Sequence, residues 1–189
     1  MKITGRLMLT MLSFSIPFMA LAGEPAPHVM SMSAVDQNSP LVNEVRKATA
    51  KFKDINAALA AGFTQATPCV SGPDFGAMGV HFVLGSRINA GTLNGSEPEA
   101  LIYEPLPNGA LRLVGVEFII LANIWQMQIP QGSTAAPVLE GHLMNYVAFP
   151  NRYGLPAFYE LHVWAWEQNP VGSFADWNTQ VSCDQQATG

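Results

Sequence analysis

Basic side chains are scarce in this sequence. It has 9 Lys and Arg against 14 Asp and Glu among 189 residues, which gives a formal net charge of −5. A protein that binds nucleic acid presents a basic face to the phosphates, and so acidic a chain does not supply one. The composition therefore argues against nucleic acid as a partner.

The common catalytic motifs are missing as well. The sequence contains no Gly-x-Ser-x-Gly nucleophile turn, no Gly-rich phosphate loop leading into a helix, no His-Glu-x-x-His and no Cys-x-x-Cys. No motif fixes a reaction, so candidate functional residues must be sought among polar side chains in unusual positions.

Cysteine is limited to two residues, Cys69 and Cys183. In an oxidising compartment an isolated pair is more often a disulfide than a metal or catalytic site. We therefore expect a Cys69–Cys183 disulfide, with two buried free thiols as the alternative.

No apolar run is long enough to span a bilayer. The longest, residues 7–21, has about 15 residues, whereas a transmembrane helix needs about 20. It follows Lys2 and Arg6 and ends in Ala20-Leu21-Ala22, which is the pattern of a secretory signal peptide. We expect residues 1–22 to be removed by cleavage after Ala22, leaving a periplasmic or secreted protein without a stable membrane anchor.

The rest of the chain has the size of one domain. Residues 23–39 show no periodicity and indicate an extended lead-in, and residues 40–185 are expected to form a single α+β domain. Ser39-Pro40 offers a helix cap and a first-turn proline. Apolar residues then recur at three- and four-residue spacing up to Gly62, which predicts an amphipathic helix of about 20 residues.

Beyond Cys69 the apolar period becomes that of strands. Strong strand patterns cover residues 78–84, 99–104, 111–121 and 158–166, and weaker ones cover 125–129 and 143–149. Pro107-Asn108-Gly109 is a strong hairpin turn signal between the second and third. We expect the helix to pack on a curved antiparallel sheet or a partly closed β-barrel.

Three ionisable residues lie in the middle of predicted strands: His81, Glu117 and His162. Burying such groups costs free energy unless a partner or ligand compensates. Because side chains alternate along a strand, we expect Glu117 to share a face with Leu113, Gly115 and Ile119. By the same alternation, His162 shares a face with Glu160, Trp164 and Trp166.

Convergence of these three side chains would create a metal site. Two histidines and one carboxylate suffice for Zn²⁺ with an open coordination position, or for non-haem Fe²⁺, so a divalent transition metal is the expected cofactor. In an enzyme, Glu117 would instead be the catalytic general base. The competing interpretation is ordinary: strand histidines are often satisfied core residues, and strand glutamates often point to water.

Four further residues are candidates for binding a substrate or small ligand: Tyr103, Glu104, His142 and Trp164. Glu104, His142 and Glu160 are also candidate additional ligands or neighbours of the metal. Aromatic residues are dense over the last third of the chain and would line a pocket for an apolar ligand, although such density more often belongs to an ordinary core.

Several segments resemble a group of exported bacterial proteins to which no activity is assigned. They are Pro98-Glu99-Ala100-Leu101-Ile102-Tyr103-Glu104, Leu111-Arg112-Leu113-Val114-Gly115-Val116-Glu117, Leu161-His162-Val163-Trp164, Asn169-Pro170, Phe174-Ala175 and Ser182-Cys183. The likeness runs from about Ile55 to Cys183. It implies export and brings with it no substrate and no catalytic residue.

Three functions stay open on the sequence alone. The first is a small-ligand-binding protein with a metal at His81, Glu117 and His162. The second is a metal-assisted hydrolase or a lyase or isomerase that uses Glu117 as base. The third is a structural module without a site, and the oligomeric state is open in all three.

Overall fold

The structure is a computed structural model that describes residues 37–186. The expected signal peptide, its cleavage after Ala22 and most of the expected lead-in lie outside the described residues. Within the described part of the chain, no helix is both long and apolar enough to cross a membrane.

The first part of the described chain is helical, but it is not one helix. It consists of α2 (Pro40–Thr49), the 3₁₀ helix η1 (Ala50–Lys53) and α3 (Ile55–Ala60). The Ser39 hydroxyl accepts a hydrogen bond from the Val42 N–H at 3.2 Å, and Pro40 occupies the first turn, as expected. The break falls at Asp54, whose backbone is extended and whose carboxylate accepts from the Asn56 N–H at 3.0 Å. The carboxylate thus caps a new helix, which the apolar spacing alone did not reveal.

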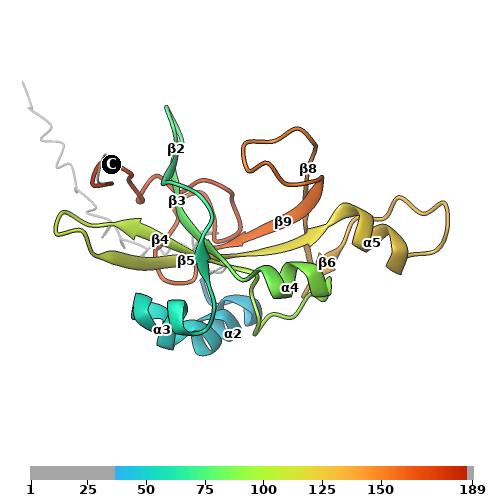
Figure 1. The fold of residues 1–189 in the computed structure, drawn as a ribbon, viewed down its shortest axis with the longest axis horizontal. Helices are drawn as coiled ribbons and strands as arrows, with labels where there is room; N and C mark the ends of the chain where they lie inside the picture. The colour runs from blue at the N-terminus through green and yellow to red at the C-terminus, as the bar shows by residue number, and fades with distance from the viewer. Residues whose placement is uncertain (1–36, 187–189) are drawn as a thin grey trace, which may run out of the picture.

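The main sheet is antiparallel and open (Figure 1). Its strands lie in the order β1-β3-β4-β5-β9-β8, and β2 also pairs with β3. Their bounds are β1 Thr64–Gln65, β2 Val70–Gly72, β3 Gly76–Val83, β4 Ala100–Pro105, β5 Leu111–Leu121, β8 Asn145–Val147 and β9 Phe158–Val163. The α+β prediction is confirmed. The alternative of a partly closed barrel is wrong, because β1 and β8 form two separate edges.

The remaining elements are short. They are α4 (Gly85–Ala90), α5 (Ala122–Gln128), and β6 (Val138–Leu139) paired with β7 (His142–Leu143). The predicted strand at 125–129 is wrong, because these residues belong largely to α5. The segment is too short for its apolar spacing to distinguish a helix from a strand. It is also rich in residues that favour helices.

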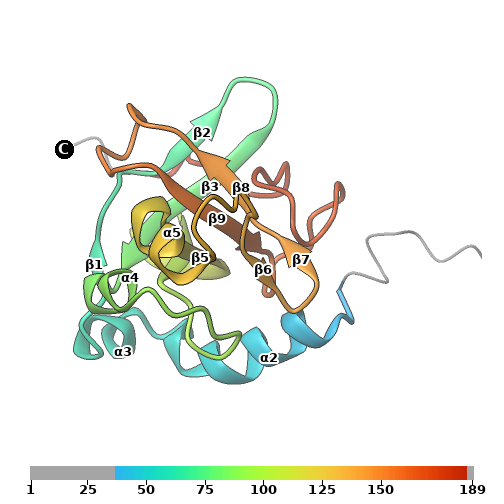
Figure 2. The same ribbon diagram turned by 90° about the vertical axis from the view of Figure 1, so that its right-hand side faces the viewer.

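The two faces of the sheet carry different residues. The largest buried cluster includes Phe82, Leu101 and Phe118 from the sheet together with Leu41 and Val45 from α2. Figures 1 and 2 show α2 and α3 along one side of the sheet, with β2 and β8 toward the other. Since His81 and Glu117 alternate with Phe82 and Phe118, they point away from the helices.

A bulge changes the alternation in β5. Ile102 lies opposite Gly115 but Tyr103 lies opposite Leu113, so Val114 is the extra residue. Leu113 therefore joins the helix-side cluster, while Val114 packs with Ile102 on the opposite face. The expectation that Leu113 shares a face with Glu117 is wrong for this reason.

A similar correction applies to Trp166. It packs against the helix-side cluster and donates its indole N–H to the Thr49 hydroxyl at 3.0 Å, rather than sharing a face with His162. The strand β9 ends at Val163, three residues before Trp166, so strand alternation no longer applies there.

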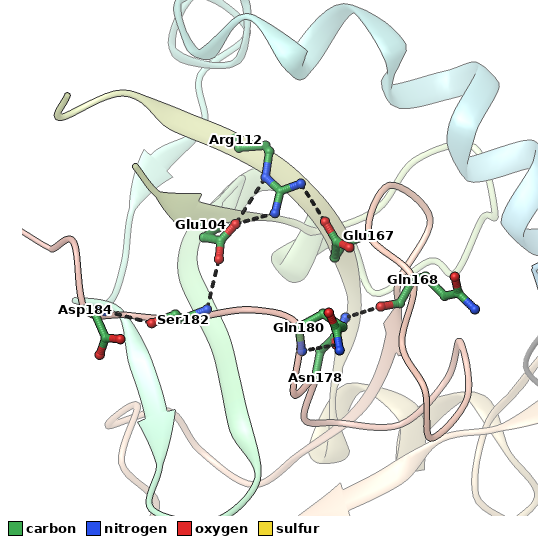
Figure 3. Close-up of polar contacts among 8 residues, drawn as sticks. All are labelled: Glu104, Arg112, Glu167, Gln168, Asn178, Gln180, Ser182 and Asp184. Atoms are coloured by element: carbon green, nitrogen blue, oxygen red, sulfur yellow. Dashed lines mark hydrogen bonds and ion pairs between the residues drawn. The ribbon is translucent and has the colours of Figure 1, made fainter. Parts of the chain in front are cut away.

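The C-terminal segment is fixed to the sheet by a disulfide and by a charged network. Cys69 and Cys183 are joined across 114 residues, as expected. Figure 3 shows Glu104 on β4 accepting from the Ser182 N–H at 3.0 Å and pairing with Arg112, which also contacts Glu167 at 2.5 Å. These contacts hold the segment after β9 against β4 and β5.

We predict that the disulfide contributes much of the stability. In the chain-entropy model, closing a loop of this length stabilises the fold by about 4–5 kcal/mol. Cys69→Ala should therefore lower the free energy of unfolding in urea by about 3–5 kcal/mol. Cys183→Ala and the double variant serve as controls and should lose the same amount, because all three remove one bond. A double variant less stable than both single variants by more than about 1 kcal/mol would contradict this.

Candidate metal centre

Strand register brings His81, Glu117 and His162 together. Glu117 on β5 lies directly opposite His162 on β9. On the other side, β4 separates β5 from β3, and it places Ala100 opposite Glu117. His81 on β3 lies opposite the next residue on the same face of β4, Ile102. His81 and Glu117 therefore meet diagonally across β4, beside the small side chain of Ala100, with 3.5 Å between His81 Nε2 and Glu117 Oε2.

All three side chains are buried. The exposed fractions are 2% for His81, 3% for Glu117 and 0% for His162. Glu117 therefore does not point to water, as the ordinary interpretation of a strand glutamate had expected. One ligand atom from each residue lies within 4.8 Å of the others, which is close enough to hold one metal ion.

Three imidazole nitrogens of this cluster have no hydrogen-bond partner. They are Nε2 of His81 and both Nδ1 and Nε2 of His162, and Oε2 of the neighbouring Glu160 is also without one. Leaving a buried polar atom unpaired costs about 1–3 kcal/mol. Such unpaired atoms in and beside the cluster mark a site where a bound cation would offset a substantial cost.

Thr67 fixes the orientation of His81. Its hydroxyl oxygen lies 3.3 Å from His81 Nδ1 and accepts from the His81 backbone N–H at 3.2 Å. A hydroxyl oxygen has two lone pairs and can accept from Nδ1–H as well. In that arrangement Nδ1 carries the ring proton, and Nε2 has the free lone pair that a metal ligand requires.

Burial keeps both imidazoles neutral. It lowers the pKa of His81 to about 3, with a further contribution from nearby His162, and it lowers the pKa of His162 to about 4. Because only the neutral ring can coordinate a metal, both histidines are in the ligating form at neutral pH.

The carboxyl groups are perturbed in the opposite direction. Burial raises the pKa of Glu117 well above its usual value, and the charge of Glu160 raises it further. Burial also raises the pKa values of Glu160 and Asp176. A cation placed among these groups would favour their charged forms.

A cavity of about 90 Å³ adjoins the centre. Its polar lining residues are Thr67, His81, Glu117 and Tyr153, and its apolar walls include Val83, Ile88, Ile119, Leu155 and Phe158. With about 30 Å³ per water in the liquid, this volume suits a few water molecules or a small ligand. His81 and Glu117 are thus shared between the cluster and the cavity.

The four candidate substrate-binding residues are mostly elsewhere. Tyr103 points to the helix side and donates its hydroxyl to the Phe52 carbonyl at 2.6 Å. Glu104 belongs to the network with Arg112, and His142 stacks on Phe174 at 3.7 Å between ring centroids. Only Trp164 adjoins the cluster, stacked 6.2 Å from His162, but it is fully buried and its indole N–H donates to the Ala175 carbonyl.

Sequence reasoning missed Thr67 and Asp176, and it counted Tyr153 only among the aromatic residues that would line a pocket. The structure places all three at or beside the centre. Thr67 precedes β2, Tyr153 lies between β8 and β9 with its ring 6.1 Å from that of His81, and Asp176 follows β9. All three lie in irregular segments, where no period indicates the direction of a side chain. The turn composition around Asp176 was the only signal, and it predicts a loop rather than a site.

No protein-family model, no curated protein and no solved structure matches this chain. The function must therefore be argued from the geometry of the site.

Glu99 offers a test of the electrostatics at a residue that is not one of the proposed metal ligands. It is buried at the start of β4 and accepts a hydrogen bond from the Ile119 N–H at 3.0 Å. Burial raises its pKa to about 7. The folded protein thus holds a proton on Glu99 that the unfolded chain releases above pH 4.5, so this contribution to stability is present at acidic pH and is lost as the pH rises through 7.

We predict that Glu99→Gln removes this pH dependence. Between pH 4.5 and 8 the stability of the wild type relative to Glu99→Gln should fall by up to roughly 3 kcal/mol, measured by urea unfolding at each pH. Asp74→Asn, at an exposed position, is the control and should follow the wild type. A constant difference between wild type and Glu99→Gln across this range would contradict the prediction.

Proposed function

We propose that this protein binds a divalent transition metal through His81, Glu117 and His162 and uses the metal to hold a small ligand. The observation that carries the proposal is the group of buried imidazole nitrogens without hydrogen-bond partners beside buried carboxylates. A fold that only needed stability would gain by replacing these groups with apolar ones.

The donor set favours Zn²⁺ or Fe²⁺. Imidazole suits these ions, whereas Ca²⁺ and Mg²⁺ prefer an all-oxygen environment. Three protein ligands leave at least one coordination position open, as in catalytic zinc sites. Because His81 and Glu117 also line the cavity, a ligand there would reach the open position.

The cavity limits the ligand. A volume of about 90 Å³ with mostly apolar walls accommodates a molecule of a few non-hydrogen atoms. An apolar body with one metal-binding atom, such as a short carboxylate, matches both the walls and the open position.

A second function, catalysis with Glu117 as general base, is favoured by one observation. The pKa of Glu117 is raised by burial, and its side chain lines the cavity, which is the setting of many catalytic carboxyls. In that case the enzyme would be a metal-assisted hydrolase or a lyase or isomerase. Glu117 cannot be a metal ligand and a free base at once, so Glu117→Gln separates the two functions: it loses the metal if Glu117 is a ligand and keeps it if Glu117 is a base.

We also propose that the protein acts outside the cytoplasm, in the periplasm or after secretion. The Cys69–Cys183 disulfide supports an oxidising compartment, and the first 22 residues have the composition of a signal peptide. The structural module without a site is disfavoured, because it gives no reason for burying His81, Glu117 and His162.

Metal binding is tested with protein from residue 23 onward, produced under oxidising conditions. After incubation with Zn²⁺ and removal of free metal, the wild type should retain zinc at a near-stoichiometric level by elemental analysis. His81→Ala, His162→Ala and Glu117→Gln should each weaken Zn²⁺ affinity by about 10- to 100-fold or more, because each removes a ligand.

The matched control is His142→Ala, which removes a histidine outside the cluster and should retain zinc like the wild type. Far-ultraviolet circular dichroism shows whether each variant is folded. Folded wild type without zinc, or equal retention by the ligand variants, would overturn the proposed metal site.

The cavity makes a separate prediction. In Co²⁺-loaded wild type, acetate should change the visible d–d absorption as it enters the open position. Val83→Phe adds a ring to the cavity wall and should retain Co²⁺ while losing most of the acetate response. Leu143→Phe, at an exposed position, is the control, and a full response in Val83→Phe would show that the ligand does not use this cavity.

A further inference from the structure

We propose that His162 bridges two cations, one held with His81 and Glu117 and the other held with Glu160 and Asp176. This inference rests on the proposed metal function and extends it to a second position. The two sets of ligand atoms share His162, and within each set the atoms lie within 4.8 Å of one another.

The two ring nitrogens of His162 support two positions. Both are buried and neither has a hydrogen-bond partner. A metal at one nitrogen satisfies that nitrogen alone. Because Nδ1 lies 3.8 Å from Asp176 Oδ1, and Glu160 Oε2 is also buried without a partner, a second cation on this side would satisfy both remaining atoms.

The separations fit shared coordination better than hydrogen bonding. Ligands about 2.0 Å from a tetrahedral ion lie about 3.3 Å from each other, whereas a hydrogen bond from Nδ1–H to a carboxylate is about 2.7–3.2 Å. The distances of 3.5 Å for His81–Glu117 and 3.8 Å for His162–Asp176 are both too long for a hydrogen bond. The simpler role for Asp176, orienting His162 by accepting its N–H, would also leave Glu160 Oε2 unpaired.

The charges balance for two ions. When the second cation binds Nδ1, the ring proton of His162 passes to solvent and the ring becomes an imidazolate with one negative charge. That charge and the carboxylates of Glu117, Glu160 and Asp176 together neutralise two divalent cations. The centre is then buried without net charge, which a low-dielectric environment favours.

The two positions differ in access to solvent. The side chain of Asp176 is 33% exposed, and its Oδ1 accepts from Asn145 Nδ2 of β8 at 3.0 Å. His81 and Glu117 are almost fully buried. The second ion should therefore exchange faster and bind more weakly than the first.

The test is a titration of the protein with Cu²⁺, which binds N/O sites tightly, followed by elemental analysis and electron paramagnetic resonance. We expect two ions per wild-type chain and one per chain in Asp176→Asn and in Glu160→Gln. In these variants the affinity for the second ion should fall by about tenfold or more, while that for the first should change less than about threefold. Asp184→Asn, outside both sets, is the matched control and should bind two ions.

The resonance signal distinguishes a bridge from two independent sites. Two Cu²⁺ ions joined by an imidazolate couple antiferromagnetically, so the low-temperature signal per bound ion should be weaker in the wild type than in Asp176→Asn. Two ions with a full, uncoupled signal, or two ions that persist in Asp176→Asn, would overturn the bridge.

The stoichiometry also separates this inference from the function on which it rests. One ion per wild-type chain, lost in His81→Ala, would overturn the second position and leave the proposed metal site in place. No bound ion in folded protein would overturn both.

Discussion

The site depends on the cost of placing ionisable side chains in a low-dielectric interior. His81, Glu117 and His162 are removed from water on one face of the sheet, while the other face is an ordinary apolar core. Without a compensating partner, each buried polar atom opposes folding. The rest of the sheet supplies enough apolar burial to tolerate that cost, and this is how a fold can retain a chemically reactive but locally unfavourable cluster.

The regular parts of this fold follow from the sequence. The strand β5 coincides with the predicted 111–121, and β3 and β4 lie within about two residues of their predicted bounds, because long apolar runs with clear alternation leave little freedom. The helix start at Ser39 follows from capping chemistry. The apolar spacing did not predict the break at Asp54 or the bulge at Val114. The break depends on a side-chain hydrogen bond that caps α3, and the bulge depends on the pairing of β5 with β4.

The candidate site was predictable in its centre and not at its margins. An ionisable residue between apolar neighbours in a strand is a visible anomaly, and this singled out His81, Glu117 and His162. Their meeting required strand order, which the spacing within each strand does not contain. Thr67, Tyr153 and Asp176 reach the centre from irregular segments, and no local pattern distinguishes them from other loop residues. Tyr103 shows the opposite error. It was a candidate for binding a ligand, but its side chain lies on the helix side of the sheet, away from the centre.

The methyl group of Ala100 has a consequence for how such centres can be recognised. On β4 Ala100 lies opposite Val83 on one side and Glu117 on the other, one pair along the sheet from Ile102, which lies opposite His81. Its small side chain thus leaves room beside Glu117 on the diagonal that leads to His81. A residue with no chemistry of its own therefore takes part in shaping the centre by leaving space next to a ligand. In related chains a bulky residue at this position would crowd Glu117 even if every donor atom were retained.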